Sequence, residues 1–204
     1  MSTTAMLALF SFLLIAFTSN PLLGSATPEP VLDISGQKVR TGVNYYILPV
    51  IRGRGGGLTL STIGNNSCPL YVVQENLEVL NGRPATFSPV DKKGVVHTST
   101  DLNIRSSGIR TTCDQSTVWK LLKQLTGVWF LSTGGVEGNP GVDTITNWFK
   151  IEKAEKDYKL VFCPSVCNCQ TLCRELGIFI DDNGKRYLSL NDKIPPFPVN
   201  FKRA

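Results

Sequence analysis

Short runs of β-branched and aromatic residues recur along this chain, and turn-forming residues separate them. No stretch keeps a helical period over three turns. About ten to twelve short strands in one domain predict an all-β sandwich or a closed barrel, and periodicity does not choose between the two. The runs occupy residues 43–51, 58–61, 70–74, 118–122, 128–131, 148–151, 158–162, 178–180 and 187–190.

Two of these regions allow a sharper reading. Asp182-Asn-Gly-Lys185 lies between two apolar runs and predicts a tight β-hairpin, because Asn and Gly accept the positive φ angles of such turns. Residues 116–124 also fit a short helix, so that alternative stays open beside the strand.

The first 26 residues form an apolar leader without a charged side chain. Met6–Phe17 is a run of twelve residues broken only by Ser11. This run is shorter than the roughly 20 apolar residues that span a bilayer, and it fits the core of a secretory signal peptide. We expect cleavage after Ala26, with a site near Ser19 as the alternative, and a mature domain over residues 27–204.

The composition of the remaining chain excludes several classes of function. The 21 Lys and Arg against 16 Asp and Glu give a formal net charge of +5, and no Lys/Arg-rich run occurs, so a nucleic-acid partner is not expected. A single His leaves no room for a His-rich metal site. We expect no cofactor, and no membrane partner once the leader is removed.

Six cysteines in a secretory chain indicate disulfides, and six allow about 15 pairings. Two of them are isolated and four lie within residues 163–173. The oxidising compartment and the short, uneven spacings argue against a Cys₄ metal site, so no metal is expected. Asn65 begins an Asn-Asn-Ser sequon and is a candidate glycosylation site.

Several motifs, in matching order and spacing, resemble the plant Kunitz (soybean trypsin inhibitor) family and its miraculin-like branch. The resemblance covers nearly all of the mature chain. It implies a β-trefoil fold over residues 27–204, with twelve strands, a six-stranded barrel and a hairpin cap. The motifs are Val31–Ile47, Gly55–Leu58, Cys68-Pro-Leu70, Val72–Gln74, Ser99–Ile104, Gly134–Val136, Gly138–Pro140, Trp148-Phe149, Tyr158–Cys163 and Gly177–Asp182.

The resemblance also implies how the cysteines pair. These pairs are Cys68–Cys113, Cys163–Cys173 and Cys167–Cys169. Only Asn168 separates the two cysteines of the last pair, so that bridge is sterically tight. The branch's cysteine for an interchain bridge would fall near residues 154–157, where none occurs, and a monomer is therefore expected.

The resemblance implies a substrate-like reactive loop that enters a serine protease. Its residues are Pro89, Val90, Asp91, Lys92, Lys93 and Gly94. Counting from Cys68 places the scissile position on Lys92, whose positive charge suits a trypsin-like pocket with an acidic base. Pro89 restricts the loop backbone. Two departures weaken the pattern: Lys93 stands where strong inhibitors carry an apolar residue, and Thr41 stands where the family has a bracing Asn.

The expected function is therefore inhibition of a trypsin-like serine protease in plant defence. The alternatives are a miraculin-like defence or storage protein with weak or no trypsin inhibition, or an inhibitor of a cysteine protease, subtilisin or α-amylase. An enzyme is not expected, because His97 is the sole His and no Gly-x-Ser-x-Gly motif occurs. Lectin-type Gln-x-Trp motifs are also missing.

The leader bears on localisation. Ser19–Leu23 resembles a vacuolar sorting propeptide of some solanaceous relatives, whereas the same residues also fit the end of a signal peptide. The protein is therefore expected to be secreted or vacuolar.

Overall fold

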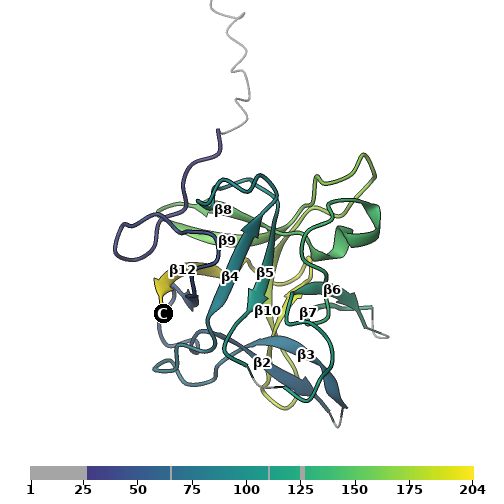
Figure 1. The fold of residues 1–204 in the computed structure, drawn as a ribbon. Coiled ribbons are helices and arrows are strands. Elements are labelled where there is room, and N and C mark those ends of the chain that lie inside the picture. The colour runs from purple at the N-terminus through teal and green to yellow at the C-terminus, as the bar shows by residue number, and fades with distance from the viewer. Residues whose placement is uncertain (1–26, 65, 110, 125–126) are drawn as a thin grey trace, which may run out of the picture.

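The computed structural model describes residues 27–64, 66–109, 111–124 and 127–204 (Figure 1). The expected signal peptide and Asn65 lie outside these ranges. Within them the chain forms twelve β-strands and one short 3₁₀ helix, and every strand pairing is antiparallel. The strands are β1 (Tyr45–Pro49), β2 (Leu58–Ile63), β3 (Asn66–Gln74), β4 (Ala85–Pro89), β5 (Leu102–Ser106), β6 (Lys120–Lys123), β7 (Trp129–Ser132), β8 (Lys150–Ala154), β9 (Asp157–Phe162), β10 (Arg174–Ile180), β11 (Arg186–Leu190) and β12 (Pro198–Arg203), and the helix is η1 (Val142–Asn147).

Six strands close into a barrel. β1 pairs with β4 and β12, β4 pairs with β5, and β9 pairs with β8 and β12. A bridge between Leu102 and Phe149 joins the start of β5 to the residue before β8 and completes the circle. Closure leaves no open edge in this layer, which is one way for a β protein to avoid edge-to-edge association.

Three hairpins, β2–β3, β6–β7 and β10–β11, form a cap over the barrel. One strand of each hairpin pairs with a strand of the other two, through Tyr71↔Ser132, Phe130↔Ser189 and Val73↔Tyr187. A six-stranded barrel with a three-hairpin cap is the β-trefoil arrangement. The expected fold class and strand number are confirmed. Of the two architectures that periodicity left open, the sandwich and the closed barrel, the structure has the barrel.

The core has two parts that follow these two layers. Side chains that alternate along the barrel strands point inward, and Phe87 and Phe201 meet edge to face there with ring centroids 5.4 Å apart. Each cap hairpin contributes one aromatic ring to a smaller cluster of Tyr71, Phe130 and Tyr187. The cluster joins the three hairpins where they meet.

Local prediction succeeded for the strands with continuous apolar runs. The hairpin predicted at Asp182–Lys185 is confirmed, since Ile180 pairs with Arg186 across it. The helix alternative at residues 116–124 is wrong, because β6 pairs with β7 along its length. The runs missed β4, β5 and β12, whose apolar residues alternate with Thr, Ser, Asn, Lys or Arg.

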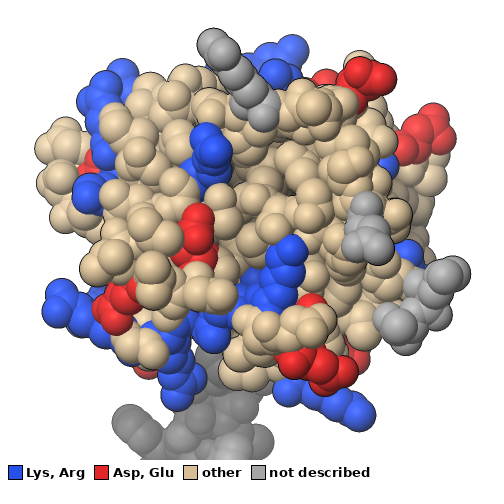
Figure 2. Space-filling view, turned by 90° about the horizontal axis from the view of Figure 1, so that it is seen from below, with Lys and Arg blue, Asp and Glu red and all other residues tan. Residues whose placement is uncertain are grey.

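Charge is dispersed over the face seen from below in Figure 2. Lys and Arg form separate groups there, with Asp and Glu between them and uncharged residues over most of the surface. Among the described residues, no helix is long and apolar enough to cross a membrane.

Candidate functional site

The predicted reactive loop begins where β4 ends, in the connection between β4 and β5 near the top of Figure 1. Its first residues form a turn, in which the Lys92 N–H donates to the Pro89 carbonyl at 3.3 Å. The Val90 N–H donates to the carbonyl of Asp101 at 2.9 Å, just before β5. The start of the loop is therefore anchored to the barrel by backbone hydrogen bonds.

The far end of the loop is held by the N-terminal segment. The Thr41 N–H donates to the Gly94 carbonyl at 3.1 Å, and Arg40 pairs with Val95 in an isolated bridge. Thr41 thus braces the loop through its backbone, although it lacks the amide side chain of the family pattern. His97 lies two residues further along, where it bridges to Pro30 and places Nδ1 3.1 Å from the Val95 carbonyl.

The backbone turns sharply between these anchors. Lys92 has φ of 54°, and Gly94 has φ of 76°, with open space where a side chain at Gly94 would begin. Positive φ is open to Gly, whereas for Lys it costs about 1–2 kcal/mol relative to extended or right-handed backbone. Lys92 is therefore not in the extended conformation that a substrate-like scissile residue requires.

The two adjacent lysines have different surroundings. The Lys93 side chain is 70% exposed, and its Nζ lies 3.5 Å from Oδ2 of Asp91. Lys92 is exposed as well, and it lines a cavity of about 420 Å³ together with Val90, Glu137 and other residues of the neighbouring loops. An exposed ion pair of this kind contributes little stability, so Asp91 chiefly shapes the turn, accepting the Lys93 N–H at 3.3 Å.

A second loop supports the base of the β4–β5 hairpin. Glu137 accepts hydrogen bonds from Ser88 on β4 and Arg105 on β5. The buried side chain of Asn103 accepts the Gly138 N–H at 2.7 Å. These contacts fix residues 137–138 against the strands from which the reactive loop projects.

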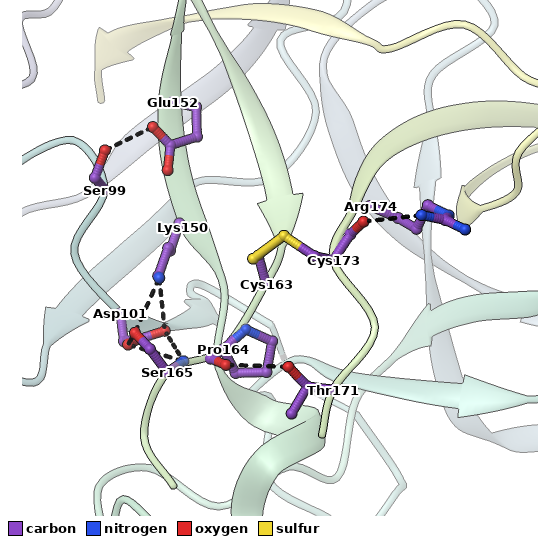
Figure 3. The surroundings of a disulfide bond; sticks show 10 residues. All are labelled: Ser99, Asp101, Lys150, Glu152, Cys163, Pro164, Ser165, Thr171, Cys173 and Arg174. Atoms are coloured by element: carbon purple, nitrogen blue, oxygen red, sulfur yellow. Dashed lines mark hydrogen bonds and ion pairs between the residues drawn. A yellow bond between two sulfur atoms is a disulfide. The ribbon is translucent and has the colours of Figure 1, made fainter. Parts of the chain in front are cut away.

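A buried acidic residue, Asp101, links the loop to the segment that follows β9. Figure 3 shows its contacts with that segment. The Asp101 carboxylate accepts the Ser165 hydroxyl at 2.6 Å and the Ser165 N–H at 3.2 Å, and it lies 3.9 Å from Lys150 Nζ. Sequence reasoning missed the contact between Asp101 and Ser165, because 64 positions separate the two residues. Asp101 lies within the Ser99–Ile104 motif, but Ser165 lies in none, and the motif gives no sign of the contact.

Three disulfides occur in the structure, joining Cys68 to Cys113, Cys163 to Cys173, and Cys167 to Cys169. The first ties β3 to the segment before β6, and the second lies beside the contacts of Asp101 (Figure 3). In the described ranges, no group of three or more His, Cys, Asp and Glu side chains is arranged to hold a metal ion.

Comparison with known proteins agrees with this architecture. Residues 31–203 match the family model of Kunitz legume type, described as trypsin and protease inhibitor. The chain is 48% identical to Kunitz trypsin inhibitor 5 of Arabidopsis thaliana, over 98% of this chain and 99% of that protein. It is 50% identical to miraculin of Synsepalum dulcificum, over 94% and 91% of the two chains.

A solved structure gives the same result in three dimensions. The Kunitz-type cysteine protease inhibitor PCPI-3 from potato superposes with a TM-score of 0.74 at 34% sequence identity. The superposition covers 87% of this chain and 98% of the potato chain. Proteins named as inhibitors of two different protease classes are therefore similar to this chain along nearly its whole described length.

Proposed function

The chain belongs to the Kunitz family of trypsin and protease inhibitors, and we propose that it inhibits a trypsin-like serine protease through the Pro89–Gly94 loop, with Lys92 as the P1 residue. The family model is described as trypsin and protease inhibitor, which names an inhibitory and not an enzymatic function. The relatives named as trypsin inhibitors support a serine protease as the target class.

The observation that carries the proposal is the anchoring of a lysine-bearing loop at both of its ends. Val90 is bonded to Asp101 on one side, and Gly94 is bonded to Thr41 on the other. A loop held in this way loses less conformational entropy on binding than a free peptide. It also keeps the two ends together after a peptide bond is cut, which favours a slowly dissociating complex over turnover.

The positive φ of Lys92 sets the expected strength of inhibition. On entering the protease, Lys92 has to adopt an extended backbone, while its position in the free protein is left-handed. The rearrangement has to break the turn hydrogen bond between the Lys92 N–H and the Pro89 carbonyl. A loss of about 0.5–1.5 kcal/mol corresponds to a roughly twofold to tenfold weaker complex than a pre-set loop would give. We therefore propose a weak trypsin inhibitor.

The same φ angle favours a second candidate function, inhibition of another hydrolase through a different surface. The similarity to the potato cysteine protease inhibitor supports a cysteine protease as that target. A defence or storage role with no trypsin inhibition is the corresponding outcome if neither protease class is bound.

Stoichiometric titration of the mature protein against trypsin tests the first proposal. Lys92→Ala is expected to raise the inhibition constant at least tenfold, because it removes the charged anchor of the interface. Lys93→Ala is the matched control, since it deletes the neighbouring lysine and is expected to change the constant less than threefold. Equal effects of the two variants would reject Lys92 as P1.

Parallel titrations distinguish the alternatives. Inhibition of a papain-like cysteine protease, subtilisin or α-amylase that is unaffected by Lys92→Ala would favour the second candidate. A protein that leaves trypsin and all three of these hydrolases active would favour the storage role.

We further propose that the protein enters the secretory route and that the mature chain is a monomer beginning at residue 27. The apolar leader and the three disulfides support the secretory route. All six cysteines are paired within the chain, which supports the monomer because none is left for an interchain bridge. N-terminal sequencing of the natural protein tests the cleavage site, and fractionation into apoplast and vacuole separates the two destinations.

A further inference from the structure

A cavity of about 450 Å³ lies away from the reactive loop, and it shares no lining residue with the cavity beside Lys92. Its volume is within the usual range of small-molecule sites, about 300–1,000 Å³. Four parts of the chain form its walls: the β1–β2 connection, the end of β3, the β10–β11 hairpin, and the proline-rich segment before β12. The lining residues used below are Ile51, Arg54, Gln74, Ile180, Arg186 and Phe197.

The apolar side of the cavity consists of large side chains that water reaches. Ile51, in the β1–β2 connection, is 45% exposed, and Ile180, at the end of β10, is 51% exposed. Phe197, in the proline-rich segment, is half-buried and lines the same cavity. Exposed aliphatic side chains that share a concave surface gain free energy when an apolar body displaces the water between them.

The walls of this cavity are fixed by backbone contacts. The Phe197 N–H donates to the Leu176 carbonyl at 2.9 Å, and the Val50 N–H donates to the Pro198 carbonyl at 3.0 Å. At Gly177 a Cβ would lie 2.6 Å from the Pro195 carbonyl oxygen, so only Gly allows this close approach of the proline-rich segment. The cavity is therefore formed before any ligand binds.

Two arginines, Arg54 and Arg186, line the polar side, and the Arg186 guanidinium is held in place there. Arg186 donates from Nε to Oε1 of the buried Gln74 at 2.8 Å, and from Nη2 to the Arg54 carbonyl at 2.6 Å. Neither contact neutralises its charge. None of the ion pairs formed within the described ranges includes Arg186 or Arg54.

Two carboxylates near the cavity accept backbone N–H groups, and neither forms an ion pair with Arg186 in the described part of the chain. Glu78 accepts the N–H of Gly53, a lining residue, at 2.7 Å. Asp181 accepts the N–H groups of Asn183 and Lys185, at 3.0 and 2.8 Å, inside the hairpin turn. Arg186 therefore has no ion-pair partner among the described residues, and an arginine already fixed by two hydrogen bonds loses little side-chain entropy when it binds a carboxylate.

We infer that this cavity binds a small amphipathic monocarboxylate, with its carboxylate on Arg186 and its apolar body against Ile51, Ile180 and Phe197. A pre-formed cavity with an apolar wall and one orienting charge is the usual composition of a small-molecule site. The site is independent of the reactive loop, so its occupation and protease inhibition are separate properties of the protein.

Binding of 4-phenylbutanoate, followed by calorimetry and amide chemical shifts, tests the site. The neutral control is 4-phenylbutan-1-ol, which has the same apolar body without the charge. The acid is expected to bind about tenfold or more tightly than the alcohol, with shifts centred on the β10–β11 hairpin. Equal affinities, absence of binding, or shifts centred on the β4–β5 loop would overturn the inference.

Two variants test the role of the guanidinium. Arg186→Gln removes the charge, and Gln74→Glu places a carboxylate against Arg186 within the protein. Both are expected to abolish the preference for the acid over the alcohol. Gln74→Glu keeps an acceptor for the Arg186 Nε and therefore retains the contact between these two side chains. It still tests the inference if Arg186→Gln fails to fold.

The matched control is Arg52→Gln. It removes an exposed arginine from the β1–β2 connection, which forms part of the cavity wall, but Arg52 itself does not line the cavity. It is expected to leave both affinities unchanged. An equal loss of acid binding in Arg52→Gln and Gln74→Glu would show that general surface charge, and not Arg186, attracts the ligand, and would overturn the assignment.

Discussion

The carboxylate of Asp101 accepts hydrogen bonds from both the hydroxyl and the backbone N–H of Ser165. The backbone carbonyl of Asp101 accepts the N–H of Val90 in the reactive loop. One buried residue therefore joins the segment that follows Cys163, drawn beside it in Figure 3, to the start of the loop. Stability of that segment and stiffness of the loop are expected to change together.

Replacing Asp101 by Ala tests this coupling. The variant leaves the Ser165 donors and Lys150 without their shared acceptor, and it is expected to lower the free energy of unfolding by about 1–3 kcal/mol. Trypsin is also expected to cut the loosened loop faster. Urea unfolding and mass spectrometry of timed digests measure the two effects.

Ser165→Ala is the control for the Asp101 variant, because it removes the hydroxyl while keeping the backbone N–H bond. Its expected effect on stability is about 0.5–1.5 kcal/mol. Faster cleavage of the Asp101 variant without any loss of stability would contradict the coupling.

The left-handed backbone of Lys92 predicts an unusual stabilising substitution. Asn accepts positive φ more readily than Lys, so Lys92→Asn is expected to raise the free energy of unfolding by about 0.5 kcal/mol, or the melting temperature by roughly 1–2 °C. Differential scanning calorimetry measures the change. The same substitution at Lys93, which lacks a positive φ, is expected to give no gain; a gain at both positions would refute the backbone explanation.

The stability that each of two disulfides adds is expected to increase with the length of the loop that it closes. The sequence separations are 45 residues for Cys68–Cys113 and 10 for Cys163–Cys173. Chain entropy assigns about 4 kcal/mol to the longer loop and about 3 kcal/mol to the shorter one. Double Cys→Ser variants, unfolded in guanidinium, measure each contribution, and a larger loss from the shorter loop would contradict the entropic order.

Alkaline pH is expected to weaken the cap through Tyr187. Burial raises the pKa of the Tyr187 hydroxyl above its ordinary value of 10.0, and the nearby Asp181 carboxylate raises it further. The folded protein then holds the Tyr187 proton more tightly than the unfolded chain does. The stability that this difference adds to the fold is fully present below about pH 10 and is lost as the pH rises through the folded pKa.

Unfolding of wild type and Tyr187→Phe at about pH 8.5 and about pH 11 isolates this contribution. The stability difference between the two proteins is expected to shift in favour of the Phe variant at the higher pH. An identical shift for Tyr46→Phe, on the barrel strand β1, would show that the effect does not belong to Tyr187.

Part of the site was predictable from the residues alone. A Lys-Lys pair flanked by Pro89 and Gly94, at a fixed distance from Cys68, marked the loop through its resemblance to a family pattern. The φ angle of Lys92 and the backbone brace from Thr41 were not predictable, because both depend on how the N-terminal segment packs against the loop.

Local sequence was enough to predict the β class, most strand positions and the Asp182–Lys185 hairpin, since side-chain alternation and turn chemistry act between neighbouring residues. The closure of the barrel through Leu102 and Phe149, and the contact between Asp101 and Ser165, emerged only in three dimensions. Such pairings join positions far apart in the chain. Their energy comes from burial and hydrogen bonds that exist only once the whole barrel has formed, and no local pattern encodes them.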